Sequence, residues 1–441
     1  MIERFFKLSK NNTDVKTEIV AGITTFMTMA YILIVNPSIL SATGMDKGAL
    51  FTATALSAAI ATLVMALVAN LPFALAPGMG LNAFFAFTVV LGMQVSWQFA
   101  LTAVLLEGII FVILTFLNVR EAIINAIPLS LKKAVSVGIG LFIAFIGLFN
   151  SGIIVTGMTH IGDGKLDGIP VKLGHITGGS ALLAIIGLLI TGFLLAKKVK
   201  GGLLLGILVT TIIGIPMGVT QVPQGLKLLS APPSLEPILW KFDFSQVFSM
   251  QMLLVLFTFL FVDMFDTVGT LVGVATKANM LDERGKVPRA KEALFADAVG
   301  TTLGAMLGTS TVTTYVESAS GVAEGGRTGL TALSTAAMFI IALFLSPLFI
   351  MIPGAATAPA LILVGLFMMS PIKDIDFDDF TEAIPAFLTI IMMPLAYSIA
   401  EGIVFGMVSY VVLKTLTGKF KDVSYLMYVL AIAFVLKFLI A

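Results

Sequence analysis

The segment Leu253–Ala275 reads LLVLFTFLFVDMFDTVGTLVGVA, an apolar run that is long enough to cross a bilayer. It carries two carboxylates, Asp263 and Asp266. A carboxylate at the centre of a membrane helix costs about 2.5–3.5 kcal/mol on insertion scales, so two in one span need a reason. The two acids are three residues apart and share a helix face, which Thr267 and Thr270 continue. We interpret this polar stripe as the wall of a water-accessible site; the alternative is a buried hydrogen-bonded pair between helices.

The composition of the whole chain is typical of a polytopic membrane protein. Of its 441 residues, 58% are hydrophobic and 12% are charged, whereas a soluble domain has about 25% charged residues. The chain has no cysteine, which excludes disulfides and thiolate metal sites, and its only histidines are His160 and His175. We therefore expect no metal and no cofactor. The net charge of +1 gives no indication of a nucleic-acid partner.

The apolar segments predict fourteen membrane spans. Segments of spanning or near-spanning length begin near Glu18, Gly48, Trp97, Lys133, Gly178, Gly201, Met250, Gly329 and Thr381. Shorter segments, broken by glycine or proline, lie around 72–92, 292–308, 309–325, 353–370 and 399–415. The last apolar run, Tyr425–Ala441, is expected to be an interfacial helix rather than a fifteenth span.

The basic residues support this topology. With a cytoplasmic N-terminus, twenty Lys and Arg residues fall in cytoplasmic segments and five in outer loops. This bias is typical of a multi-pass protein of the plasma membrane, embedded in the lipid bilayer.

Short motifs recur in the same order in the two halves of the chain. They are ALF at 49–51 and 293–295, IP followed by GLF at 127–142 and 352–367, and a glycine pair at 202/206 and 402/406. The matches pair spans 2 with 9, 5 with 12 and 7 with 14. An odd number of spans in each half forces opposite orientations, which is the inverted-repeat design of secondary transporters.

The third and tenth segments are the predicted location of a site, because transporters of this design bind substrate where broken helices meet at the midplane. Residues 71–85 read LPFALAPGMGLNAFF, and residues 308–321 read GTSTVTTYVESASG. Proline, glycine and a run of Thr and Val favour an extended piece before a short helix in each. Extended backbone at this depth needs cover, and the two pieces can cover each other by pairing. The positive ends of the two short helices would then point at the site.

Four stretches resemble the AzgA-like guanine/hypoxanthine permeases, which are related to the nucleobase–ascorbate transporters typified by uracil permease. They are EIVAGITTFMTMAYILIVNPSIL at 18–40, APGMGLNAFF at 76–85, VDMFDTVGTL at 262–271 and TTYVES at 313–318. The resemblance extends over essentially the whole chain. It implies an all-α fold of about fourteen spans in 7+7 inverted repeats. It also implies proton-coupled import of purine nucleobases, often by homodimers.

The same resemblance implies a division into a core and a gate. The core would comprise residues 1–130 (spans 1–4) and 247–350 (spans 8–11). The gate would comprise 131–246 (spans 5–7) and 351–441 (spans 12–14 with the C-terminal helix). We expect the two Gly-Leu-Phe elements to lie on gate helices that face the core.

The resemblance also implies roles for single residues. Tyr315-Val316-Glu317 is similar to the element that binds uracil in uracil permease, whereas two aspartates replace a Glu and a His in the eighth span. A 6-oxopurine presents N–H donors and a carbonyl acceptor, which suit carboxylates and an amide. The expected substrate-binding residues are Asn82, Phe84, Asp263, Tyr315 and Glu317, and the expected proton-coupling residues are Asp263, Asp266 and Glu317.

Several alternatives stay open at this point. An anion transporter or exchanger on the same fold would need a cationic residue where the broken segments meet, and the acids argue against it. A passive channel would not need titratable groups. An intramembrane enzyme would need a nucleophile–base pair or a set of metal ligands, and we find neither. The residues do not decide which purine is preferred, which acid carries the proton, or whether the coupling ion is a proton or sodium.

Other charged residues are interpreted as structural. Glu107 in the fourth span and Asp297 in the ninth do not lie at a broken helix. Glu324 and Arg327 are expected to form an interfacial ion pair or a cap.

Overall fold

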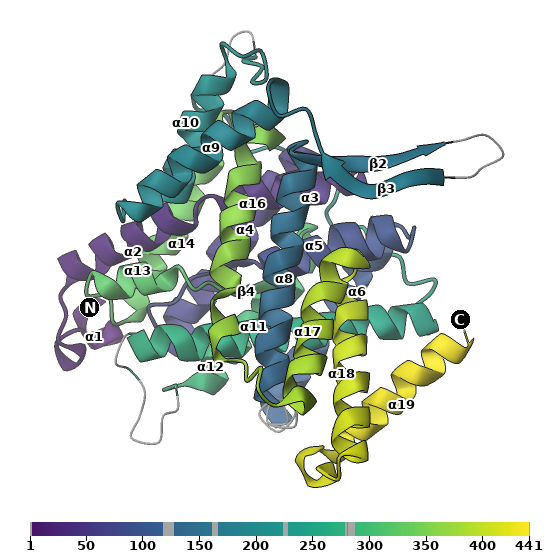
Figure 1. The fold of residues 1–441 in the computed structure, drawn as a ribbon. Coiled ribbons are helices and arrows are strands. Elements are labelled where there is room, and N and C mark those ends of the chain that lie inside the picture. Colours follow the sequence, from purple (N-terminus) through teal and green to yellow (C-terminus); the bar gives the residue numbers. More distant parts are fainter. Residues whose placement is uncertain are drawn as a thin grey trace.

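The computed structural model describes residues 2–117, 128–160, 166–223, 228–277, 280 and 287–440. The helical bundle is shown in Figure 1. Within these residues, seven helices are long and apolar enough to span a membrane, and shorter apolar helices accompany them. The predicted fold class, an all-α polytopic membrane protein, is confirmed.

The first seven segments follow the predicted order. They are α2 (Val15–Met29) with α3 (Ile32–Leu40); α4 (Lys47–Val64) with the π-helix η3 (Met65–Ala69); β1 (Leu75–Pro77) with α5 (Met79–Ala83) and the π-helix η4 (Phe84–Gly92); α6 (Trp97–Leu117); α8 (Leu129–Asn150); α9 (Gly179–Ala196); and α10 (Gly202–Gly214).

The second seven segments repeat this order. They are α11 (Met250–Lys277); α12 (Ala290–Leu307); β4 (Val312–Thr314) with α13 (Ser318–Ala323); α14 (Gly329–Leu343) with α15 (Ser346–Ile350); α16 (Gly354–Met368); α17 (Phe380–Leu395); and α18 (Ile399–Leu416). In both halves the third segment is a short strand followed by a short helix, as predicted.

The remaining elements lie at the ends and in the connections. They are α1 (Ile2–Phe6), the hairpin β2 (Ile154–His160) and β3 (Leu166–Leu173), α19 (Tyr425–Ile440), and the 3-10 turns η1 (Ser9–Asn11), η2 (Ser41–Thr43), η5 (Ser370–Asp374) and η6 (Phe420–Asp422). The antiparallel hairpin projects from the bundle, and α19 lies against α18 (Figure 1). At 16 residues, α19 is shorter than the roughly 20 residues of a typical span. Its interfacial placement stays a prediction.

Equivalent contacts in the two halves reflect the repeat. A Cβ added to Gly206 of α10 would collide with Thr191 of α9, and one added to Gly406 of α18 would collide with Thr389 of α17. In each half, therefore, a glycine on the seventh segment permits close packing on a threonine of the sixth. The 7+7 inverted repeat is the architecture of the chain.

The Gly-Leu-Phe elements lie on α8 and α16, the fifth and twelfth segments. Gly140 of α8 and Gly365 of α16 contact each other, since a Cβ on Gly140 would lie 2.6 Å from the carbonyl oxygen of Gly365. Whether these elements face the core stays a prediction, because the division into core and gate is itself a proposal. The two glycines bring two repeat-related helices together, because only glycine lets two backbones approach so closely.

The helices form two packed groups. In the first, α14 packs on α2 and α4, while α12 packs on α4 and α6. In the second, α8 packs on α16 and α17, α9 on α10 and α16, and α17 on α18. Where the groups meet, the packing around α5 is apolar.

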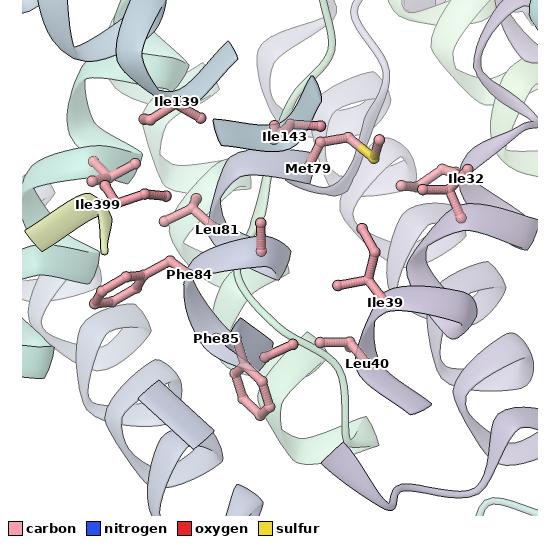
Figure 2. Packing of buried hydrophobic residues seen from close by; sticks show 14 of the residues in the cluster. Ile32, Ile39, Leu40, Met79, Leu81, Phe84, Phe85, Ile139, Ile143 and Ile399 are labelled. Carbon is pink, nitrogen blue, oxygen red and sulfur yellow. The ribbon is translucent and has the colours of Figure 1, made fainter. Parts of the chain in front are cut away.

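Figure 2 shows this apolar contact from close by: Met79 points toward Ile32 of α3, and Ile139 and Ile143 of α8 lie beside Met79 and Leu81. Gly80 permits the approach of α8, because a Cβ there would lie 2.7 Å from Cγ2 of Ile139.

Candidate functional site

The two broken segments pair as an antiparallel ribbon in the interior of the bundle. The register joins Leu75 with Thr314, Ala76 with Thr313 and Pro77 with Val312. Backbone bonds extend it at both ends: the N–H of Gly78 donates to Thr311 and the N–H of Tyr315 donates to Ala74, each over 2.9 Å. All residues of both strands are buried. The predicted cover of one extended piece by the other is confirmed.

Three consecutive hydroxyls fix the entry to β4, and each contacts a different span. Thr309 accepts a hydrogen bond from Asn36 of α3 over 2.9 Å. Ser310 donates to the side-chain carbonyl of Asn82 on α5. Thr311 donates to Glu107 of α6 over 2.5 Å. These three side-chain hydrogen bonds tie the loop before β4 to three other spans.

Glu317 lies directly after the ribbon, at the start of α13. Its carboxylate accepts a hydrogen bond of 2.6 Å from the hydroxyl of Tyr31, which lies at the break between α2 and α3. Tyr31 is 1% exposed, whereas Glu317 is half-buried. The contact links the break in the first span to the break in the tenth. We did not predict that Tyr31 belongs to the site. One indication of it was present in the sequence, because a tyrosine hydroxyl in the middle of a span needs a hydrogen-bond partner.

Asp266 approaches the ribbon from the eighth span. A Cβ added to Gly78, between β1 and α5, would lie 3.7 Å from Oδ2 of Asp266. Asp266 is also within electrostatic range of Glu317 and Asp297. Residues from the third, eighth and tenth segments therefore lie along the ribbon, with Asn82 beyond the end of β1 and Glu317 beyond the end of β4.

Asp263 lies deeper in the same span, in a network around the hydroxyl of Thr267. That oxygen is 3.2 Å from Oδ1 of Asp263, 2.7 Å from Oδ1 of Asp297 and 2.7 Å from the hydroxyl of Thr313 on β4. Both aspartates and Thr267 are fully buried. Asp297, which we interpreted as structural from the sequence, is thus one hydroxyl away from Asp263 and from the ribbon.

The aromatic candidates pack within the protein. The hydroxyl of Tyr315 donates to the carbonyl oxygen of Pro77 over 2.5 Å, so it ties β4 to β1. The ring of Phe84 packs edge-on against Phe259 of α11, with ring centroids 4.8 Å apart, and is fully buried. Asn82, which is also fully buried, holds Ser310 and lies 3.5 Å from the carbonyl oxygen of Pro77.

Of the two expectations for Glu324 and Arg327, the cap is found, since Arg327 bonds the last turn of α13, whereas the ion pair of Glu324 is with a different residue. Glu324 forms an ion pair with Lys200, in the connection between α9 and α10. The guanidinium of Arg327 donates to the carbonyl oxygens of Val322 and Gly326. The first contact joins residues from the two packed groups of helices.

The architecture is similar to that of solved membrane transporters. The transmembrane domain of the cyanobacterial bicarbonate transporter BicA matches with a TM-score of 0.64 and 16% identity, over 88% of this chain and 97% of that one. The anion transporter Slc26a9 of mouse matches with a TM-score of 0.61 and 13% identity, over 92% of this chain and 68% of that one. At these identities the likeness concerns the fold alone.

Relatives by sequence match almost end to end. The guanine/hypoxanthine permease PbuG of Bacillus subtilis is 47% identical, over 99% of both chains. The adenine permease AdeP of Escherichia coli is 44% identical, over 99% of this chain and 96% of that one. Residues 16–405 match the model of the Xan_ur_permease group, described as the Permease family. The chain therefore belongs to this Permease family, among relatives that are named as purine permeases, and it is an integral membrane transporter rather than an enzyme.

Proposed function

We propose that this protein imports purine nucleobases together with protons, and that guanine and hypoxanthine are its substrates. The observation that carries the proposal is the placement of three polar side chains along the buried ribbon: Asn82 follows one end, Glu317 follows the other, and Asp266 lies near Gly78. The names of the relatives support a purine, and they include both guanine/hypoxanthine and adenine permeases.

The chemistry of the residues favours a 6-oxopurine over adenine. The carboxylate of Glu317 accepts hydrogen bonds from ring N–H groups, and a 6-oxopurine presents such a group beside its carbonyl oxygen. The amide of Asn82 both donates and accepts, so it suits that carbonyl. Adenine presents a bare ring nitrogen at the equivalent edge, which a charged carboxylate does not bind.

We assign Tyr315 and Phe84 to the same site as its walls. Tyr315 would hold the two strands in register through Pro77, and Phe84 would turn a ring face to the base when its edge-on contact with Phe259 opens.

The proton would be carried by the acids of the eighth and tenth segments. Asp266 is half-buried and faces the ribbon junction, Asp263 is bonded to Thr267 below it, and Glu317 lies across the ribbon. Two or more carboxylates in a dry site favour the uptake of a proton by one of them. Substrate and proton would then bind within one cluster, which is the arrangement that couples their movements.

We further propose that the two groups of packed helices are the core and the gate. Residues 1–130 and 247–350 would move as one body against residues 131–246 and 351–441, as rocking around a fixed site requires. The N-terminus would be cytoplasmic, in the plasma membrane, and two copies would associate as a homodimer. An anion carrier is disfavoured, because the side chains that converge at the ribbon are acids.

The test is uptake of labelled hypoxanthine by cells or proteoliposomes that contain the protein, with unlabelled guanine, hypoxanthine and adenine as competitors. We expect guanine to compete at least about tenfold better than adenine, which corresponds to one lost hydrogen bond to a charged group. Glu317→Gln is expected to abolish uptake with normal amounts in the membrane.

The matched control is Glu236→Gln, on an exposed residue of an outer connection, and it should transport as the wild type does. Wild-type uptake and affinity in Glu317→Gln would remove Glu317 from the site. No saturable purine uptake by the wild type would overturn the proposed function.

A further inference from the structure

The outer edge of each strand of the ribbon is closed by a single threonine hydroxyl. Thr62 of α4 accepts from the N–H of Leu75 over 2.9 Å and donates to the carbonyl oxygen of the same residue over 3.1 Å. Thr301 of α12 contacts Val312 in the same way, 3.2 Å from its N–H and 2.9 Å from its carbonyl oxygen. Each hydroxyl thus bonds the N–H and the carbonyl oxygen of one strand residue, as a neighbouring strand would in a wider sheet.

These two contacts are equivalent in the inverted repeat. Each threonine lies on the second segment of its half and closes the strand that begins the third segment. The helices α4 and α12 meet one residue earlier, where a Cβ on Gly300 would lie 2.6 Å from that of Ala61. Both threonines are fully buried, so no water replaces their bonds.

Each strand leads directly into a residue of the candidate site. β1 is followed by α5, which carries Asn82, and β4 is followed within three residues by Glu317. A backbone N–H and a carbonyl left without partners would draw the strand away from its register, because unpaired groups are costly in a buried ribbon. The register of the ribbon, and with it the position of both site residues, therefore depends on the two hydroxyls.

We propose that Thr62 and Thr301 are a pair of positioning residues for substrate binding. Thr62 holds β1 at Leu75, opposite Thr314, and Thr301 holds β4 at Val312, opposite Pro77. The two hydroxyls together fix the ribbon from which Asn82 and Glu317 extend. Neither hydroxyl touches the substrate. The identity of the substrate in this inference rests on the proposed function, whereas the effect on the two strands does not.

The first test measures the kinetics of hypoxanthine uptake in Thr62→Val and Thr301→Val, which keep the shape of threonine and lose its hydroxyl. We expect each variant to raise KM by at least about tenfold, with the maximal rate per folded transporter within about twofold of the wild type. Thr62→Ser and Thr301→Ser keep the hydroxyl and should restore KM. The control is Thr115→Val, whose buried hydroxyl donates to the carbonyl oxygen of Phe111 in the preceding turn of α6.

The second test does not use a substrate. Hydrogen exchange of the purified proteins should be faster than in the wild type in residues 72–80 of Thr62→Val and in residues 310–318 of Thr301→Val. In each variant, exchange in the other strand should change less. Exchange at wild-type rates in both strands would overturn the inference.

The outcomes separate this inference from the proposed function. If the valine variants merely lower the amount of folded protein and keep the wild-type KM, the threonines stabilise the fold and the inference is wrong. If the wild type takes up no purine, the proposed function fails, and the exchange measurement still decides whether each hydroxyl holds its own strand.

Discussion

Glu317 and Tyr31 form the contact that joins two broken spans at the level of single residues. A buried tyrosine hydroxyl needs a partner, and a carboxylate offers an acceptor that is stronger than a neutral group. The bond therefore orients Glu317 before any substrate arrives. Pre-orientation of this kind lowers the cost of binding, because a fixed side chain loses less conformational freedom.

Asp263 and Asp266 differ in their surroundings, although they share a helix face. Asp263 is fully buried beside Thr267, whereas Asp266 is half-buried near Gly78. We expect that, of the variants Asp263→Asn and Asp266→Asn, at least one still binds hypoxanthine but no longer accumulates it in response to a pH gradient. Binding is measured by calorimetry on purified protein, and accumulation in proteoliposomes with an alkaline interior.

The control for this pair is Asp378→Asn, an exposed aspartate in the connection before α17. It should bind and accumulate hypoxanthine as the wild type does. If both variants of the eighth span concentrate hypoxanthine when the pH gradient is imposed, the coupling proton is carried elsewhere.

At the scale of elements, the broken segments were predictable because their residues forbid a continuous helix. Pro72, Pro77 and Gly78 disrupt a continuous helix through this segment, and the Thr-Val run before Glu317 favours a strand. The pairing of the two pieces followed from the need to cover backbone at membrane depth. Local sequence contains this information.

The partners of these elements were not predictable, because they come from distant spans. Thr309, Ser310 and Thr311 each bond a different helix, and nothing in their spacing identifies which. The ion pair of Glu324 with Lys200 was missed for the same reason, since a nearer arginine was available.

The repeated sequence motifs would not have identified Thr62 and Thr301 either. Thr62 follows Phe51 by eleven residues, whereas Thr301 follows Phe295 by six. The contact is repeated in space while the sequence spacing is not, so motif matching alone does not connect the two hydroxyls.

The N-terminus of α17 gives a prediction that tests an element outside the membrane spans. Asp379 accepts hydrogen bonds from the N–H and hydroxyl of Thr381, and Lys419 donates to it over 2.7 Å. The hydrogen bond from Lys419, and then those from Thr381, hold the pKa of Asp379 well below its ordinary value of 3.8. Because the pKa of Asp379 is lower in the folded than in the unfolded protein, the ionised carboxylate stabilises the fold at pH values above the unfolded pKa. This stabilisation is lost as the pH falls from the unfolded pKa toward the folded one.

We therefore expect Asp379→Asn to lower the midpoint of thermal unfolding by a few degrees at neutral pH, and Asp379→Ala to lower it further because the helix cap is also lost. The difference between wild type and Asp379→Asn should be constant from about pH 8 to about pH 5.5 and shrink below about pH 4. Thermal unfolding of the purified protein measures this, with Asp378→Asn as the control. A difference that grows as the pH falls would contradict this account.

The whole molecule combines a polar centre with an apolar contact around it. Asn82 bonds Ser310 before β4, Glu317 follows β4 and Asp266 lies near Gly78, while Met79, Leu81 and Ile139 meet where the two groups of helices pack (Figure 2). If the two groups move as the proposed core and gate, the apolar contact around α5 would let them slide, and the hydrogen-bonded ribbon would keep the site residues together. The 7+7 repeat places one strand and one half-helix from each half at the centre.

The central claim is that this centre binds an uncharged purine and a proton together, and the most direct test is electrical. Addition of hypoxanthine to proteoliposomes on a supported membrane should give a transient current of positive charge in the direction of transport. The current should persist when choline replaces sodium, and it should vanish in Glu317→Gln but not in Glu236→Gln. A current that requires sodium, or one that Glu317→Gln leaves unchanged, would contradict the account.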